Sequence, residues 1–381
     1  MIEIHKRLDF QRYFAREPVN LALLTGLTVV LFLFVAGLSR MYHAEQESLA
    51  DEWSARGEAD LHAQRYRDAV NDFRTALLYA RDNDSYQLNL AEALIGDKRI
   101  DEAYAYLINL WDRQPENGLV NLELARIAAG KGQTQKSLRY YHNAVYATWP
   151  DHEDTEQRKT RLELIEYLLR INARAQAESE LIAQAANPGD KPSDLTHLGD
   201  LFLQAQDYER ALSEYRSSLA AYRHDPAAIA GAGNAAFELG RYALAQRYLE
   251  QAVEAAPDDT KSAARLRITQ QVMRLDPFRR QMTTAERARI VVEAFTLAGQ
   301  RLQSCAPANS LQPATKLTGL AQQWATLKPR ITERGLKRNP DLINTAMELV
   351  FTIERQTSTV CSVTSDTDTA LLLIANMHEV L

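Results

Sequence analysis

The sequence predicts an all-α fold: an α-solenoid of about six helix-turn-helix repeats, with one N-terminal transmembrane helix and a helical C-terminal module. Three observations predict it. A helical segment recurs, first as RYRDAVNDFRTALLYA from Arg65 and again as DYERALSEYRSSLAAY from Asp207. The small residue at its centre returns at intervals of 34 residues, a period typical of helical repeats. One long uncharged apolar run lies near the N-terminus.

The apolar run covers residues 18–39. About 20 apolar residues at a rise of about 1.5 Å each span a hydrocarbon core of roughly 30 Å. We therefore expect a cytoplasmic segment at 1–18 and a transmembrane helix at 19–39. A cleavable signal peptide is the alternative, because residues 35–37 (VAG) form a passable cleavage site. The length of the run and of its leader favours an uncleaved anchor.

The charges that flank the run predict its orientation. Lys6, Arg7, Arg12 and Arg16 precede it, whereas Arg40 alone follows closely. Since positive residues stay on the cytoplasmic side, the N-terminus should be cytoplasmic and the bulk of the chain extracytoplasmic. In a bacterium this is the periplasmic face of the inner membrane. We expect a single crossing, since no second run of this length follows.

Six copies of the repeat can be aligned on the small residue of the second helix. Its positions are Ala69, Ala103, Ser137, Ala177, Ala211 and Ala245. The intervals are 34, 34, 40, 34 and 34 residues, so about six residues are inserted near 148–157.

Each copy is predicted to form two amphipathic helices joined by a tight turn. The first copy carries Trp53, Gly57 and Leu61 on its first helix and Tyr66, Ala69, Phe73 and Ala76 on its second. Small residues let two helices approach, and the aromatic ring fills the space beside them. Gly132 and Gly240 fall in turns, where a positive φ is needed.

This pattern resembles the tetratricopeptide repeat (TPR) family over residues 50–257. The resemblance implies stacked copies with one continuous core and a capping helix, expected at 258–275. The fourth copy departs from the pattern at Ile165, Arg174 and Gln184, so we expect it to be distorted.

The resemblance also implies a concave groove lined by the first helices. The residues that follow the small packing position are Glu58, Glu92, Arg126, Glu166, Asp200 and Asn234. Neighbouring apolar candidates are Leu61, Leu88, Ile95, Leu122, Leu203 and Phe237. Four acids against one arginine favour a basic or polar segment of a protein partner. The alternative is an ordinary solvated helix face.

Residues 276–381 resemble no family known to us and are expected to form a helical module. Helix starts are predicted at Thr283, at Asn339, and at Asp366 or Asp368. The two cysteines, Cys305 and Cys361, lie in the exported part, where a disulfide is permitted. Spacing leaves both a disulfide and two separate buried thiols open.

The sequence offers little for catalysis. Residues 231–236 (GAGNAA) match a dinucleotide-binding pattern but fall within a predicted helix, where small residues serve packing. No HExxH, GxSxG or CxxC motif is present. We expect no enzyme, no cofactor and no metal. The net charge of −6 at pH 7 and the acidic pI also argue against nucleic acid as a partner.

The expected function is that of a membrane-anchored TPR scaffold that binds a protein partner outside the cytoplasm, in envelope assembly or secretion. Two alternatives remain open. The array could build a homo-oligomer, or it could target a ligand-binding or enzymatic C-terminal module.

Overall fold

A computed structural model describes residues 3–147, 149, 153–189, 191–305, 315–361 and 365–378, and within these residues every regular element is a helix. The chain divides into two compact units, Met1–Leu164 and Ile165–Leu381, which are described in turn.

The first unit contains three helical hairpins. Its helices are α1 (Glu3–His62), α2 (Tyr66–Tyr79), α3 (Asp84–Gly96), α4 (Ile100–Arg113), α5 (Gly118–Gly130) and α6 (Thr134–Val145), and it ends within α7 (Glu153–Arg170). The hairpins α1–α2, α3–α4 and α5–α6 match the first three predicted copies. In α3 and α5, Asn83 and Asn117 cap the N-terminus by accepting a backbone N–H three residues on.

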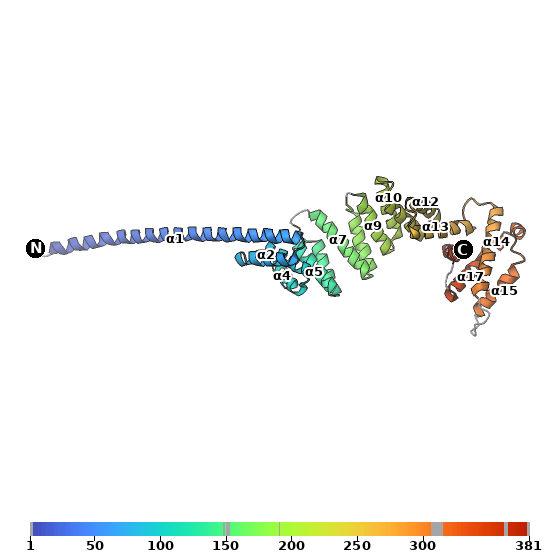
Figure 1. Cartoon of the computed structure of the whole chain (residues 1–381), viewed down its shortest axis with the longest axis horizontal. Helices are drawn as coiled ribbons and strands as arrows, with labels where there is room; N and C mark the ends of the chain where they lie inside the picture. The colour runs from blue at the N-terminus through green and yellow to red at the C-terminus, as the bar shows by residue number, and fades with distance from the viewer. Residues whose placement is uncertain are drawn as a thin grey trace. The chain divides into compact units, whose positions relative to one another are not determined.

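Helix α1 combines two predicted elements. It runs without interruption through the apolar run and the first helix of the first repeat. Figure 1 shows its N-terminal part extending past the other helices of its unit. The large apolar side chains from Leu21 to Leu38 are exposed, and the stretch is long and apolar enough to cross a membrane.

Glycines allow aromatic rings of neighbouring helices to approach the backbone closely. Within the first hairpin, a Cβ on Gly57 would lie 2.9 Å from the ring of Phe73. Between the first and second hairpins, a Cβ on Gly96 would lie 2.2 Å from the ring of Tyr66. The predicted pairing of small residues with aromatic rings is thus confirmed at the first hairpin. It also fixes the register in which α2 returns along α1.

Each turn inside a hairpin uses one residue with positive φ. The six residues are Gln64, Lys98, Gly132, Asn172, Gln206 and Gly240, with φ between 58° and 68°. The prediction for Gly132 and Gly240 is confirmed. The other four copies place a side chain in the same left-handed conformation, which glycine adopts at lower cost.

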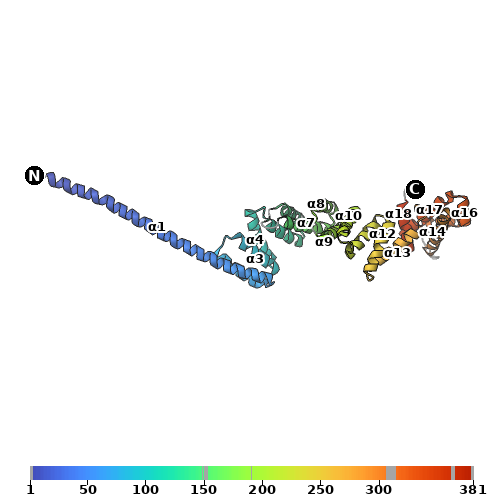
Figure 2. The same ribbon diagram turned by 90° about the horizontal axis from the view of Figure 1, so that it is seen from above.

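The second unit continues the hairpins and ends in the C-terminal module. Its helices are α8 (Arg174–Ala185), α9 (Pro192–Ala205), α10 (Tyr208–Ala221), α11 (Pro226–Glu238), α12 (Tyr242–Ala255), α13 (Thr260–Leu275), α14 (Thr284–Cys305), α15 (Thr315–Leu327), α16 (Glu333–Arg338), α17 (Asp341–Val360) and α18 (Asp366–Met377). The glycine-rich stretch at 231–236 lies inside α11, so it cannot form the strand-to-helix loop of a dinucleotide site. Helix α13 packs on α11, α12 and α18. Figure 2 shows it beside α12 and α18.

The C-terminal module has a continuous apolar core between α14, α15, α17 and α18. Cys305 and Cys361 are joined by a disulfide across a Cα–Cα distance of 5.8 Å. Helix α16 was not predicted from the sequence.

The helix starts of this module partly differ from the prediction. Thr283 accepts the N–H of Glu286, as expected of a cap. Helix α17 begins next to Pro340, but Asn339 provides no side-chain cap. The prediction of Asp366 or Asp368 as the cap of α18 is wrong, because the hydroxyl of Ser365 accepts the N–H of Asp368 instead.

Candidate partner-binding surface

In the first unit the predicted groove positions form a row that contains several acidic side chains and one arginine. Glu58 is exposed on α1, Glu92 is half-buried on α3 and Arg126 is exposed on α5. The structure adds two carboxylates that the sequence analysis missed, Glu123 on α5 and Glu163 on α7.

The one cation in this row is neutralised within the protein. The Nε of Arg126 donates to Glu163 Oε1 at 2.9 Å and its Nη2 to Oε2 at 2.6 Å. Its Nη1 donates to Glu123 Oε1 at 2.5 Å. Two-point guanidinium–carboxylate pairs are geometrically specific. The phenol of Tyr141 also donates to Glu163, at 2.8 Å, and so fixes that carboxylate.

Burial makes two of the acids hold their protons more tightly. Burial raises the pKa of Glu92 above the ordinary 4.5, and the charge of Glu123 raises it further. Burial also raises the pKa of Glu123, against the opposing effect of Arg126. A bound cation would favour the ionised form of both groups.

The row continues onto α1. Glu58 accepts a hydrogen bond from Asn89 Nδ2 at 3.2 Å. Asp51 accepts one from the hydroxyl of Tyr86. Burial, and then this hydrogen bond, raise the pKa of that phenol to about 12. We call Asp51, Glu58, Glu92, Glu123 and Glu163 the acidic surface of the first unit. The guanidinium of Arg126 is bonded to two of these carboxylates, those of Glu123 and Glu163.

The missed residues follow a rule. A residue three positions before the groove position contacts the groove residue of the preceding copy. Asn89 contacts Glu58 and Glu163 contacts Arg126 in the first unit. In the second unit His197 Nε2 lies 3.6 Å from Glu166 Oε1. The groove therefore has two residues per copy, and the sequence analysis used one.

The predicted groove residues of the second unit have different surroundings. Asp200 is exposed and accepts a 2.6 Å hydrogen bond from the hydroxyl of Tyr215. Asn234 is only 7% exposed and accepts from Arg265 of α13 at 2.8 Å. The same guanidinium lies 5.3 Å from the ring centre of Phe237. Helix α13 thus covers the groove position of the sixth copy.

The apolar candidates are less accessible than predicted for an open groove. Leu61, Leu88, Ile95 and Leu203 are half-buried, and Leu122 is 6% exposed. These side chains can contact a ligand at their exposed ends, but they do not give the groove a broad apolar surface. Charge, rather than apolar area, is the main feature of the groove positions in the first unit.

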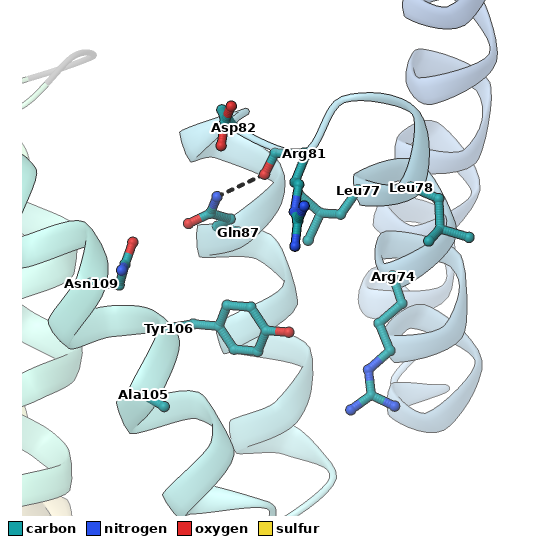
Figure 3. Close-up of a pocket in the computed structure, with 9 residues that line it drawn as sticks. All are labelled: Arg74, Leu77, Leu78, Arg81, Asp82, Gln87, Ala105, Tyr106 and Asn109. Carbon is teal, nitrogen blue, oxygen red and sulfur yellow. Dashed lines mark hydrogen bonds between the residues drawn. The ribbon is translucent and has the colours of Figure 1, made fainter.

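A separate cavity of about 720 Å³ lies between α2 and α4. Arg74, Leu77, Leu78, Arg81 and Tyr106 are among its lining residues (Figure 3). Arg74 is paired with Glu102 at 2.9 Å. No cluster of three or more metal-ligating side chains occurs in the part of the chain that the structure describes.

Several solved structures match parts of the chain at low sequence identity. PilF of Pseudomonas aeruginosa is 15% identical, with a TM-score of 0.43 over 57% of this chain and 97% of that one. PilW, described as a widely conserved type IV pilus biogenesis factor, is 18% identical, with a TM-score of 0.41 over 56% and 96%. YrrB, described as a TPR protein with an unusual peptide-binding site, is 15% identical, with a TM-score of 0.41 over 50% and 95%.

No curated protein sequence matches the chain. Models of the tetratricopeptide repeat family match residues 54–117, in the first unit, and residues 202–267, in the second. The first stretch covers the last residues of α1 together with α2, α3 and α4, and the second covers the end of α9, all of α10, α11 and α12, and the first half of α13. The chain therefore contains tetratricopeptide repeats in both of its units.

Proposed function

We propose that this protein is a membrane-anchored scaffold whose first unit binds a basic segment of a protein partner. The observation that carries the proposal is the acidic surface formed by Asp51, Glu58, Glu92, Glu123 and Glu163. Two of the five carboxylates, those of Glu123 and Glu163, share the guanidinium of Arg126. Lysine or arginine side chains of a partner would supply the missing positive charge.

The anchor in this proposal is the apolar part of α1. Its large side chains are exposed to an extent that water does not favour, which supports placement in lipid rather than in a protein core. The flanking charges support a cytoplasmic N-terminus and an extracytoplasmic array. Because α1 continues into the first repeat, the anchor and the acidic surface share one helix.

The experiment is photo-crosslinking of the full-length protein in its native membrane, with capture compared between two charge-matched variants. The test variant carries Glu58→Lys and Glu92→Lys. The control carries Asp112→Lys and Glu116→Lys, which make the same charge change at exposed residues outside the acidic surface.

We expect the test variant to lose the captured partner and the control to keep it. Equal capture by both variants would show that the acidic surface does not hold the partner. Loss in both would mean that overall charge, rather than this surface, governs capture. Circular dichroism of each variant verifies that the helices are intact.

A further inference from the structure

The C-terminal end of α2 points back toward the apolar run of α1. Gly57 lies against Phe73, and Ala50 packs in one cluster with Ala76 and Ala80. In this antiparallel register Ala80 is level with Ala50. The end of α2 and the loop after it therefore form the edge of the first repeat that is nearest to the apolar run.

This edge exposes apolar side chains and both signs of charge, with Asp82 exposed next to Arg81. Leu78 is 81% exposed, more than any other large apolar side chain in the described part of the chain, those of the apolar run included. Tyr79 is 36% exposed, and Arg81 is exposed beside it. We call Leu78, Tyr79 and Arg81 the proximal edge. Figure 3 shows Leu78 and Arg81 at this end of α2.

Such a composition is unusual for a solvated helix end. Leu78 is not needed to close the hairpin, because Leu77 and Ala80 are the neighbours that pack against the cluster of Ala50. Tyrosine together with basic residues is typical of the layer between lipid headgroups and water. On α1 itself, Met41 and Tyr42 are 72% and 60% exposed just beyond the apolar run.

The distances allow the proximal edge to meet lipid. Ala50 follows Ser39 by eleven residues, which is about 16 Å along a helix. The headgroup layer occupies roughly 5–8 Å of that distance. Helix α2 lies about 9 Å to one side of α1, with its outer side chains several Å further. A tilt of about 30–40° toward α2, within the range of transmembrane helices, closes the remaining gap.

We propose that the proximal edge rests on the phospholipid headgroup layer of the membrane that α1 crosses. Leu78 and Tyr79 enter the interfacial layer, and Arg81 meets headgroup phosphates. Because Arg74 is already paired with Glu102, Arg81 is the cation that serves this contact. The inference rests on the membrane anchor of the proposed function but not on which side of the membrane the array lies.

Contact with the membrane would have a consequence for partner binding. It would fix the tilt of α1 and hold the acidic surface at a constant height above the lipid. A partner segment would then reach Asp51 and Glu58 close to the membrane surface. This arrangement favours partners that are themselves membrane-bound.

The test uses the full chain in vesicles of phosphatidylethanolamine and phosphatidylglycerol. A fluorophore sensitive to polarity is attached in turn to Leu78→Cys, Val30→Cys and Gln64→Cys. The native cysteines form a disulfide and should not react without reductant. Val30 reports on the anchor. Gln64 lies in the turn at the opposite end of the hairpin and serves as the control.

We expect nitroxide-labelled headgroups to quench the probe at Leu78 strongly and the probe at Gln64 little, with acyl-chain nitroxides quenching the probe at Val30. Quenching at Val30 with equal, weak quenching at Leu78 and Gln64 would overturn the proximal-edge proposal and leave the anchor intact. A probe at Leu78 that is shielded from water but not quenched would also overturn it, because protein would then cover the edge. Absence of quenching at Val30 would refute the anchor itself.

Discussion

Arg126 on α5 makes a two-point contact with Glu163 on α7, with distances of 2.9 and 2.6 Å. The one arginine among the predicted groove positions therefore serves the protein's own carboxylates. This contact links two consecutive first helices, whereas the bond from Arg126 to Glu123 lies within α5. The row keeps an excess of negative charge because this cation is shared between two acids.

Replacing Arg126 should lower the stability of the fold but raise its affinity for a basic peptide. We expect Arg126→Ala to lower the free energy of unfolding by about 1 kcal/mol, a modest loss because the guanidinium is 46% exposed. The same variant should bind a lysine-rich peptide severalfold more tightly, since a repelling charge has gone. Urea unfolding and isothermal titration calorimetry measure the two effects. Lys136→Ala removes a charge from α6 and should leave the affinity unchanged; an equal gain there would contradict a local effect.

Much of this arrangement follows from sequence arithmetic, and some of it does not. The 34-residue period predicted the hairpins and the register of Glu58, Glu92 and Arg126. It could also have predicted Glu123 and Glu163, because a position three residues earlier is the neighbour on the same helix face. The contact between Glu163 and Arg126, however, depends on how closely successive copies stack, and no pattern within a single copy reveals that distance.

The continuity of α1 was also readable in principle. Residues 40–56 contain neither glycine nor proline, so nothing interrupts a helix between the apolar run and the first repeat. The pairing of Cys305 with Cys361 was not readable, because the segment between them forms several helices whose packing sets the Cα–Cα distance. The exposure of Leu78 required the structure, since its sequence neighbours Leu77 and Ala80 are equally apolar.

The affinity for a basic segment should depend on pH. The pKa values of Glu92 and Glu123 are both raised above 4.5 in the free protein. A bound cation favours the ionised forms, so binding releases protons and the affinity rises with pH through these pKa values. We expect a lysine-rich peptide to bind more weakly as pH falls from 8 toward 5. Calorimetry in two buffers of different ionisation enthalpy detects the proton release. Glu92→Gln should flatten the profile, and an unchanged profile would refute the role of Glu92.

The turns of the first unit allow a paired test of backbone strain. Gln64 holds a φ of 58° at the position where the third copy has Gly132. Relief of the left-handed conformation should let Gln64→Gly stabilise the protein by up to about 1 kcal/mol. A Cβ on Gly132 would meet no atom within 4 Å, so Gly132→Ala should cost about 1–2 kcal/mol through backbone conformation alone. Urea midpoints measure both, with Gln64→Ala as a near-neutral control. A stabilised Gly132→Ala would contradict the explanation.

Glu354 should make the second unit less stable at alkaline pH. Its side chain is 2% exposed in the C-terminal module. Burial, and then the charge of Asp368, raise its pKa to about 8, although Arg301 opposes the shift. Since the folded protein holds this proton more tightly than the unfolded chain, stability is fully present below pH 4.5 and falls as pH rises through 8. Each pKa unit corresponds to about 1.4 kcal/mol, so the total loss can reach a few kcal/mol.

Glu354→Gln keeps the shape of the side chain and removes the titration. We expect denaturant unfolding of the variant to give nearly equal free energies at pH 6 and pH 9, where the wild type loses stability. Glu348→Gln, an exposed substitution on the same helix, should behave as the wild type does. A variant at Glu354 that loses as much stability between pH 6 and 9 as the wild type would assign the titration to another group. Helix α17 would then carry a buried carboxylate that is already ionised at neutral pH and is held in that form by Arg301.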